Sequence, residues 1–216
     1  MPRIPRLTLG NHVYHVLNRS ARKAPLFVDA EDYLGFERLM SEATRRVEMR
    51  IIAYCLMPTH WHMLLWPVRD GDISAFVKWL ATTHAARWTR RHQCVGGGAV
   101  YQSRFKSIPV QEGHHLYWVW RYVERNALRA NIVERAEDWR WGSLWHRLHQ
   151  GGGGVASDGP VNLPSDWMHI VNMPQTEAEL ADFRGHARLD RPFGCEGWLT
   201  NMSRPRGRPH LRNTKK

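Results

Sequence analysis

The sequence predicts an α+β protein with a ferredoxin-like split βαβ core, an antiparallel sheet and one added C-terminal helix. Three observations lead to this fold class. Some segments alternate with the period of a strand, whereas others repeat apolar residues at helical spacing. These segments follow in the order strand, helix, strand, strand, helix, strand, helix. Glycine and proline mark breaks between them. We expect helices to cover one face of the sheet.

The first strand and the first helix are predicted between residues 11 and 47. Val13, His15 and Leu17 alternate with their neighbours, which indicates a strand over residues 11–18. Asp29 is a suitable N-cap, because its carboxylate can accept a hydrogen bond from a free N–H group of the first helical turn. The apolar residues of the helix are Tyr33, Phe36, Met40, Ala43 and Val47.

A β-hairpin and a second helix are predicted next. Residues 49–57 and 60–66 are short apolar segments, and Pro58 and Thr59 form the turn between them. Asp72 is expected to cap the following helix. The apolar side of this helix consists of Ile73, Phe76, Val77, Leu80 and Trp88, and its last turns carry Arg87, Arg90, Arg91 and His92.

A fourth strand and a third helix complete the predicted core. Three glycines at 96–98 break the second helix, and residues 100–110 continue as an extended, basic segment. A helix is predicted from residue 113 to about residue 128, because its apolar residues lie on one arc. These residues are Leu116, Val119, Trp120, Val123 and Ala127.

Three parts are predicted along the chain: a functional domain over 1–150, a small, weakly specified appendage over 151–203 and a basic, disordered tail over 204–216. Glycines at 151–154 mark the first boundary, and residues 199–216 contain six basic residues and no acidic one. In the tail, Arg204, Arg206 and Arg208 form an AT-hook-like strip that could enter the minor groove of A·T-rich DNA. The alternative is a solvated tail that aids solubility and nonspecific binding.

The composition favours a polyanionic partner. The chain has 31 Lys and Arg residues against 20 Asp and Glu, and its pI is near 10.2, so nucleic acid is the first candidate. An apolar run of about 18 residues and a signal-peptide pattern are both missing, so we expect a cytoplasmic protein with no membrane partner. The three cysteines are far apart, which argues against a disulfide framework or a zinc ribbon.

One pair of histidines is a candidate metal site. His60 and His62 are two residues apart on a predicted strand, so both imidazoles point to the same side and a cation could bind between them. The alternative is a pair of partly buried histidines with structural hydrogen bonds. Tyr122 and Asn126 share one flank of the third helix, away from the centre of its apolar arc. Two imidazoles, an amide oxygen and a phenol match the needs of covalent phosphodiester cleavage with a divalent ion.

Basic and polar residues near these positions are candidate phosphate contacts. The end of the second helix and the fourth strand each present basic side chains, which attract phosphates. The flank of the third helix adds an aromatic surface on which a base could stack. The candidate DNA-binding residues are Arg19, Arg87, Arg91, Gln102, Arg104, Lys106, His115, Trp118 and Arg129, with Arg204, Arg206 and Arg208 in the tail.

Four stretches resemble the REP-associated tyrosine transposases, a branch of the single-tyrosine HUH transposases of bacterial insertion sequences. They are Tyr14-His15-Val16 with Arg19, residues 54–62 (YCLMPTHWH), residues 100–107 (VYQSRFKS) and residues 122–130 (YVERNALRA). The resemblance spans roughly residues 10–147. It implies that His60 and His62 bind the metal, that Tyr122 is the nucleophile on a catalytic helix, and that Asn126 stands where related transposases place a third ligand. Ala127 departs from the proline that the family often has after this asparagine.

The function that this resemblance implies is cleavage and rejoining of single-stranded DNA at palindromic hairpins such as REP elements. Tyr122 would attack a phosphodiester and form a 5′-phosphotyrosine, with Mg²⁺ or Mn²⁺ as cofactor. The protein would act as a monomer or homodimer in the bacterial cytoplasm, and associate with the nucleoid when bound to DNA. Two alternatives remain open. The chain could be a non-catalytic nucleic-acid-binding module, or a metal-dependent phosphodiesterase that uses water as the nucleophile.

Overall fold

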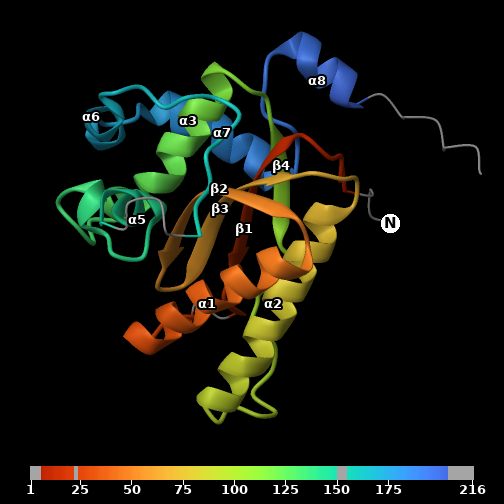
Figure 1. Cartoon of the computed structure of the whole chain (residues 1–216), viewed down its shortest axis with the longest axis vertical. Coiled ribbons are helices and arrows are strands. Elements are labelled where there is room, and N and C mark those ends of the chain that lie inside the picture. The colour runs from red at the N-terminus through yellow and green to blue at the C-terminus, as the bar shows by residue number, and fades with distance from the viewer. Residues whose placement is uncertain (1–5, 22–23, 150–154, 204–216) are drawn as a thin grey trace, which may run out of the picture.

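A four-stranded antiparallel sheet forms the centre of the protein, in the strand order β2-β3-β1-β4 (Figure 1). The computed structural model describes residues 6–21, 24–149 and 155–203, so the predicted basic tail with Arg204, Arg206 and Arg208 lies outside the described residues. The strands are β1 (Val13–Arg19), β2 (Met49–Met57), β3 (His60–Pro67) and β4 (Lys106–Val110). One helix connects β1 to β2 and another connects β3 to β4, so the predicted α+β split βαβ fold is confirmed.

Two helices cover one face of this sheet, as the sequence predicts. They are α1 (Ala30–Arg46) and α2 (Asp72–Arg91). The fully buried Trp61 of β3 points to this face and packs against Phe36 of α1, with ring centroids 5.8 Å apart. Apolar strand residues and helix residues thus form one continuous core cluster on this side.

The helix caps agree with the sequence at one of the two predicted positions. Asp29 caps α1, because its carboxylate accepts a hydrogen bond from the N–H group of Asp32. Asp72 does not cap α2, contrary to prediction. Gly71 occupies the N-cap with a φ of 89°, a left-handed conformation that suits glycine, and Asp72 is the first helical residue.

The opposite face of the sheet is also covered, which corrects the expectation of one covered face. α3 (His114–Glu124) packs across it, and Figure 1 shows α3 and α7 on the side opposite to α1 and α2. Every residue of β2 except Arg50 is buried, and a strand buried on both sides needs a layer on each side. The other helices are α4 (Asn126–Arg129), the 3-10 helix η2 (Ala136–Asp138), α5 (Ser143–His149), α6 (Trp167–Asn172), α7 (Glu177–Arg188) and α8 (Glu196–Ser203).

The last strand and the third helix are shorter than predicted. β4 begins at Lys106, because Lys106 pairs with Leu17 and the described residues before it form only an isolated bridge from Tyr101 to Ser20. α3 ends at Glu124, so the predicted helix over 113–128 is divided into α3 and α4. Arg125 separates them with a ψ of −3°, which turns the chain out of the regular helix.

Glu124 at the end of α3 joins this helix to the segments that follow. Its side chain is fully buried and accepts hydrogen bonds from Nε1 of Trp120 at 3.1 Å, Nε1 of Trp167 at 2.8 Å and Oγ of Ser143 at 2.8 Å. Arg147 forms an ion pair with the same carboxylate. A single buried charge therefore connects α3, α5 and α6.

The segment over 155–203, expected to be weakly specified, contains three helices, of which α6 and α7 pack onto the core. Its buried residues that share the α3 core cluster are Trp167, Val171, Leu180, Phe183 and Phe193. The predicted boundary near residue 150 remains a prediction. We refer to residues 155–203 as the C-terminal segment.

Later parts of the chain also cover both edges of the sheet. Short bridges pair Ile51 with Ala156 and Cys55 with Gly142 beside β2, and Val110 with Phe193 beside β4. These bridges give hydrogen-bond partners to backbone groups that an open edge would leave unpaired.

In the described part of the chain, no helix is both long and apolar enough to cross a membrane. Cys55, Cys94 and Cys195 are all free, and Cys55 is buried in the core.

Candidate active site

Three histidines gather on the face of the sheet that α3 covers. His60 and His62 share one side of β3, as their spacing predicts, and the ring centroids of the two imidazoles are 5.0 Å apart. His15 on the neighbouring strand β1 adds a third ring. Its Nε2 atom lies 2.9 Å from Nδ1 of His62, and the two rings are stacked.

Hydrogen bonds leave one ring nitrogen of each predicted ligand for a cation. His62 uses Nδ1 toward His15, and Nδ1 of His60 is 3.2 Å from Oγ1 of Thr59. Nε2 is therefore the atom with which each ring could bind a metal. A hydrogen bond to the other nitrogen fixes the ring orientation, as is usual for metal-binding histidines.

Burial keeps these imidazoles neutral at pH 7. It lowers the pKa of His15 to about 3 and that of His60 to about 4, with the positive charges of Arg19 and Arg129 lowering the pKa of His60 further. Burial also holds the pKa of His62 well below its ordinary value, and the neighbouring His60 and His15 add to this effect. Neutral imidazole is the form that binds a metal ion.

Tyr122 on α3 lies on the same side of the sheet as the three histidines. The centroid of its ring is 5.7 Å from that of His62 and 6.0 Å from that of His15, in both cases with the rings edge to face. The guanidinium of Arg129 lies 5.1 Å from the centroid of the Tyr122 ring. The predicted nucleophile and one predicted ligand are thus neighbours within a single chain.

Asn126 is almost fully buried and is connected to the site through Arg129. Its Oδ1 accepts a hydrogen bond from Arg129 at 3.0 Å, and its Nδ2 has no hydrogen-bond partner within the described residues. The positive charge of Arg129 also lowers the pKa of both His60 and His62, so the residue that binds the Asn126 amide also acts on the imidazoles. A buried N–H group without an acceptor lowers the stability of the fold, unless a ligand or a water molecule accepts its hydrogen bond.

The donor set fits a divalent cation only in part. Within the described ranges, no group of three or more His, Cys, Asp or Glu side chains is arranged to hold a metal ion. A cation at this position would therefore take His60 and His62 from the protein, with Asn126 as a neutral amide candidate and oxygen atoms of phosphate or water in the remaining positions.

The flank of α3 that carries Tyr122 is covered by α7. Phe183 of α7 is fully buried, with its ring centroid 4.9 Å from that of Tyr122 and 5.1 Å from that of His15. Trp118 therefore does not present the base-stacking surface expected from the sequence, because its ring packs against Phe183 and is 8% exposed. His115 on the same flank packs edge-on against Phe193 of the C-terminal segment.

A family model described as "Transposase IS200 like" matches residues 8–126, which is more than half of the chain. The chain belongs to the IS200-like transposase family. The matched region of this transposase includes His15, His60, His62 and Tyr122, so the side chains that gather on the α3 face all lie within it. The resemblance found in the sequence is thus confirmed at the level of the family.

Two solved structures are similar to this transposase. One is described as a REP-associated tyrosine transposase bound to a REP hairpin; it is 18% identical, covers 76% of this chain and 96% of its own, and gives a TM-score of 0.58. The other is a Deinococcus radiodurans protein provisionally described as a transposase, with 21% identity, coverage of 57% and 96%, and a TM-score of 0.42. The first of these agrees with the fold described above. No curated protein matches the sequence.

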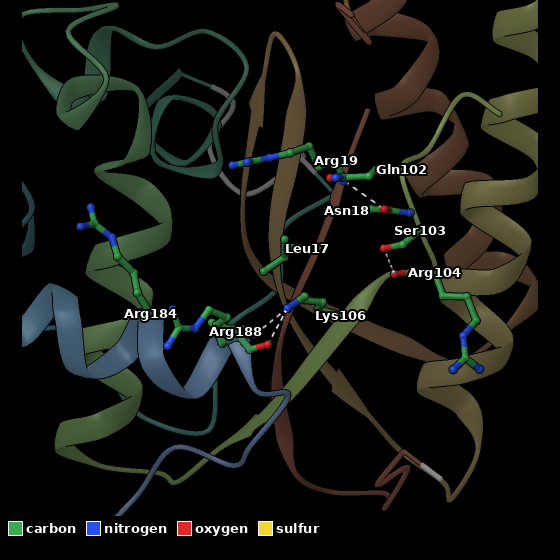
Figure 2. Close-up of a pocket in the computed structure, with 10 residues that line it drawn as sticks. Leu17, Asn18, Arg19, Gln102, Ser103, Arg104, Lys106, Arg184 and Arg188 are labelled. Atoms are coloured by element: carbon green, nitrogen blue, oxygen red, sulfur yellow. Dashed lines mark hydrogen bonds between the residues drawn. The ribbon is translucent and has the colours of Figure 1, made fainter. Parts of the chain in front are cut away.

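Four of the predicted DNA-binding residues of the transposase gather beside the histidines. Arg19, Gln102, Arg104 and Lys106 line a pocket of about 420 Å³ (Figure 2). Arg19 lies opposite His60 in the pairing of β1 with β3. These four residues therefore lie near the candidate site, and their role in DNA binding stays a prediction.

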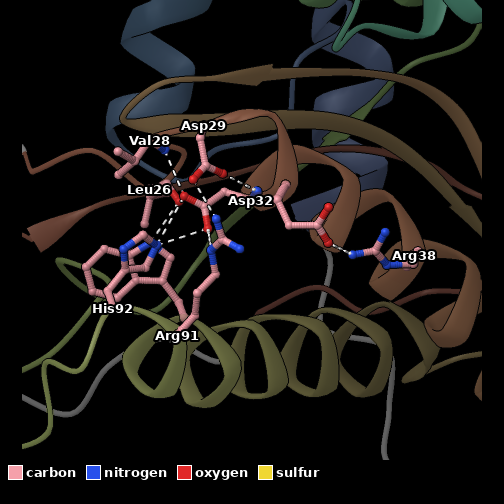
Figure 3. Close-up of polar contacts among 9 residues, drawn as sticks. Leu26, Val28, Asp29, Asp32, Arg38, Arg91 and His92 are labelled. Carbon is pink, nitrogen blue, oxygen red and sulfur yellow. Dashed lines mark hydrogen bonds and ion pairs between the residues drawn. The ribbon is translucent and has the colours of Figure 1, made fainter.

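Arg87 and Arg91 do not face this site, contrary to expectation. They belong to α2, on the other face of the sheet, where Arg87 pairs with Glu42 at 2.8 Å. Arg91 pairs with Asp29 at 2.5 Å and with Asp32 at 2.9 Å (Figure 3). Acidic residues of α1 and of its N-cap pair with these two arginines, so this helix end connects α2 to α1.

Sequence reasoning missed two residues of the site. His15 lies on the same side of β1 as Val13 and Leu17, and the pairing of Leu17 with His62 places that side on the histidine face. The period of β1 was visible in the sequence, whereas the pairing with β3 was not. Phe183 lies in an amphipathic helix, and that pattern indicates burial without indicating against which surface.

Proposed function

We propose that this transposase cleaves and rejoins single-stranded DNA through a covalent bond to Tyr122. The observation that supports this most strongly is the distance of 5.7 Å between the ring centroids of Tyr122 and His62, on one side of the sheet. Both side chains belong to the same chain. One copy would therefore contain the nucleophile together with His60 and His62.

In the proposed reaction, the phenol oxygen of Tyr122 attacks the phosphorus of a phosphodiester. A bond forms between this oxygen and phosphorus, and the bond from phosphorus to the 3′ oxygen breaks. The products are a 5′-phosphotyrosine and a free 3′-hydroxyl, so the phenol proton is transferred in net terms to the 3′ oxygen. Because the phosphotyrosine keeps the ester bond, attack by a 3′-hydroxyl rejoins the DNA without nucleotide hydrolysis.

The surrounding residues would orient and charge the site. His15 would hold His62 by its hydrogen bond, and Arg129 would supply a positive charge beside the phenol and the phosphate. When bound by His60 and His62, Mg²⁺ or Mn²⁺ would neutralise charge on the phosphate. Burial of Tyr122 would keep water from competing with the phenol.

Hairpin DNA with a single-stranded flank is the substrate class that we propose. A structure with the same fold is described as holding a REP hairpin, which supports this choice by analogy. The basic residues Arg19, Arg104 and Lys106 beside the histidines would bind phosphates. Such contacts position a nucleic acid without reading its sequence.

The test is formation of a covalent protein–DNA adduct. The full-length protein is incubated with Mn²⁺ and labelled hairpin DNA that carries a single-stranded flank, and the mixture is separated under denaturing conditions. We expect an adduct with the native protein and none with Tyr122→Phe, because phenylalanine has no nucleophilic oxygen.

Tyr117→Phe is the matched control on the same helix. The Tyr117 hydroxyl donates to the carbonyl of Asn162, so its loss leaves the histidine face unchanged and should preserve the adduct. Cleavage that persists in Tyr122→Phe would instead indicate a phosphodiesterase that uses water. Binding without any adduct in the native protein would indicate a non-catalytic binding module.

A further inference from the structure

The pocket beside the candidate active site is built by two separate parts of the chain. Arg19, Gln102, Arg104 and Lys106 line it from β1, β4 and the segment before β4, and α7 of the C-terminal segment contributes Arg184 and Arg188. Figure 2 shows the two α7 arginines on one side, Gln102 and Arg104 on the other, and Lys106 between them. The region matched by the family model ends at residue 126, so the α7 side of the pocket lies outside it.

The charged residues that line this pocket have one sign. Half of its ten lining residues are basic and none is acidic. Arg19, Arg104 and Arg188 form no ion pair with a carboxylate among the described residues, and Arg184 is 3.8 Å from the 89% exposed side chain of Glu177. Lys106 donates two hydrogen bonds to backbone carbonyls at the end of α7, and its nearest carboxylate is 3.9 Å away. A phosphate entering the pocket would meet positive charge that is largely uncompensated.

The pocket adjoins the residues that would carry out the reaction. Leu17 and Arg19, which line it, lie opposite His62 and His60 in the β1–β3 pairing. Arg184 directly follows Phe183, whose ring contacts that of Tyr122. A DNA strand with one phosphate at Tyr122 would therefore place its neighbouring nucleotides in this pocket.

We infer that Arg184 and Arg188 bind phosphates of the single-stranded DNA flank next to the cleaved bond. The two arginines are four residues apart on a helix, so they share one face of α7 and can contact the same strand. Helix α7 is then one wall of a DNA-binding groove as well as the cover of the α3 flank. This inference rests on the proposed function, because it takes single-stranded DNA as the ligand.

The test measures how much a single-stranded flank adds to DNA affinity. The probes are a labelled DNA hairpin with an oligothymidine flank and the same hairpin without it. Equilibrium binding to the full-length protein is followed by fluorescence anisotropy without a divalent ion, at several salt concentrations. For Arg184→Ala/Arg188→Ala we expect roughly tenfold weaker binding of the flanked probe at ~0.1 M salt, and a salt dependence shallower by about 1.4 in log–log slope, since each phosphate contact in a single strand contributes about 0.7.

Two further variants separate specific contacts from overall charge. Arg184→Lys/Arg188→Lys keeps both charges and should retain most of the flank affinity. Arg38→Ala/Arg69→Ala removes the same charge from two exposed ion pairs outside the pocket and should leave the flank contribution unchanged. Thermal unfolding of each variant confirms that the fold is kept.

The outcomes distinguish this inference from the proposed function. An unchanged flank contribution in Arg184→Ala/Arg188→Ala, or an equal loss in the Arg38 and Arg69 control, would overturn the inference. A native protein with no flank preference would also overturn it. A third result would refute the proposed function and leave the groove in place. In that case the native protein forms no covalent adduct, and flank affinity is lost in Arg184→Ala/Arg188→Ala and not in the control.

Discussion

His15 contacts the candidate site through one hydrogen bond to His62 and through its stacked ring. The bond occupies Nδ1 of His62 and leaves Nε2 for a ligand. In metal sites such a partner sets the orientation of the ligand and its donor strength, and its loss typically reduces metal affinity by about 10- to 100-fold.

We therefore expect His15→Leu to weaken Mn²⁺ binding by about 10- to 100-fold while the fold is kept, because leucine fills the buried position without the hydrogen bond. Mn²⁺ affinity is measured directly by electron paramagnetic resonance of the bound ion, in addition to adduct formation. His114→Leu changes an exposed histidine at the start of α3 and should leave the affinity unchanged. Equal Mn²⁺ affinity in native protein and His15→Leu would mean that His15 has only a packing role.

Single positions were predictable from the sequence where a local period decides the side on which a residue lies. The spacing of His60 and His62 places both on one side of β3, and the helical angle of Tyr122 away from the apolar arc directs its ring to one flank of α3. The burial of Trp118 was not predictable in this way, because it depends on α7, which is distant in the chain.

Among the secondary-structure elements, α3 depends on the buried carboxylate of Glu124. Three neutral donors and Arg147 satisfy it, and they come from α3, α5 and α6. Burial lowers the pKa of Arg147 to about 10, so Arg147 is still charged at pH 7.

Glu124→Ala should lower the free energy of unfolding by about 3–5 kcal/mol, because it removes the acceptor of three buried donors and the partner of the partly buried Arg147. Urea unfolding measures this loss. Glu42→Ala removes the partner of Arg87 in a more exposed ion pair and should cost only about 0.2–1 kcal/mol. Similar losses in the two variants would show that the buried carboxylate contributes no more than a surface pair.

Elements were predictable from the sequence where the apolar pattern is local. The first strand, the hairpin, α1 and α2 lie close to their predicted ranges. The second covered face of the sheet was not expected, although the continuous apolar run of β2 is typical of a strand buried on both sides. The position of α7 could not be derived, because an amphipathic pattern does not specify the partner surface.

For the whole molecule, buried neutral histidines make stability depend on pH. Burial lowers the pKa of His84 to about 4, with His92 lowering it further and Asp32 opposing the shift. In the unfolded chain the pKa of a histidine is about 6.5. The unfolded state therefore takes up a proton that the folded state excludes, and stability present above pH 6.5 is lost as the pH falls toward about 4.

We expect His84→Gln to reduce the slope of unfolding free energy against pH by about 1.4 kcal/mol per pH unit between about pH 4 and 6.5. Glutamine can keep a hydrogen bond to the hydroxyl of Tyr101, which lies 2.7 Å from Nδ1 of His84. Urea unfolding at stepped pH gives the slope. If native protein and variant have equal slopes in this window, His84 does not contribute to acid sensitivity.

The bridges along β2 and β4 limit how far the protein can be shortened. Gly142, Ala156 and Phe193, which pair with the outer strands, all follow the region shared with the IS200-like family. A fragment that ends at residue 126 would leave two rows of N–H and C=O groups open to strands of other molecules, which is a recognised route to aggregation. A shortened form of this chain that stays soluble therefore needs to retain the sequence as far as Phe193, because that residue covers the β4 edge.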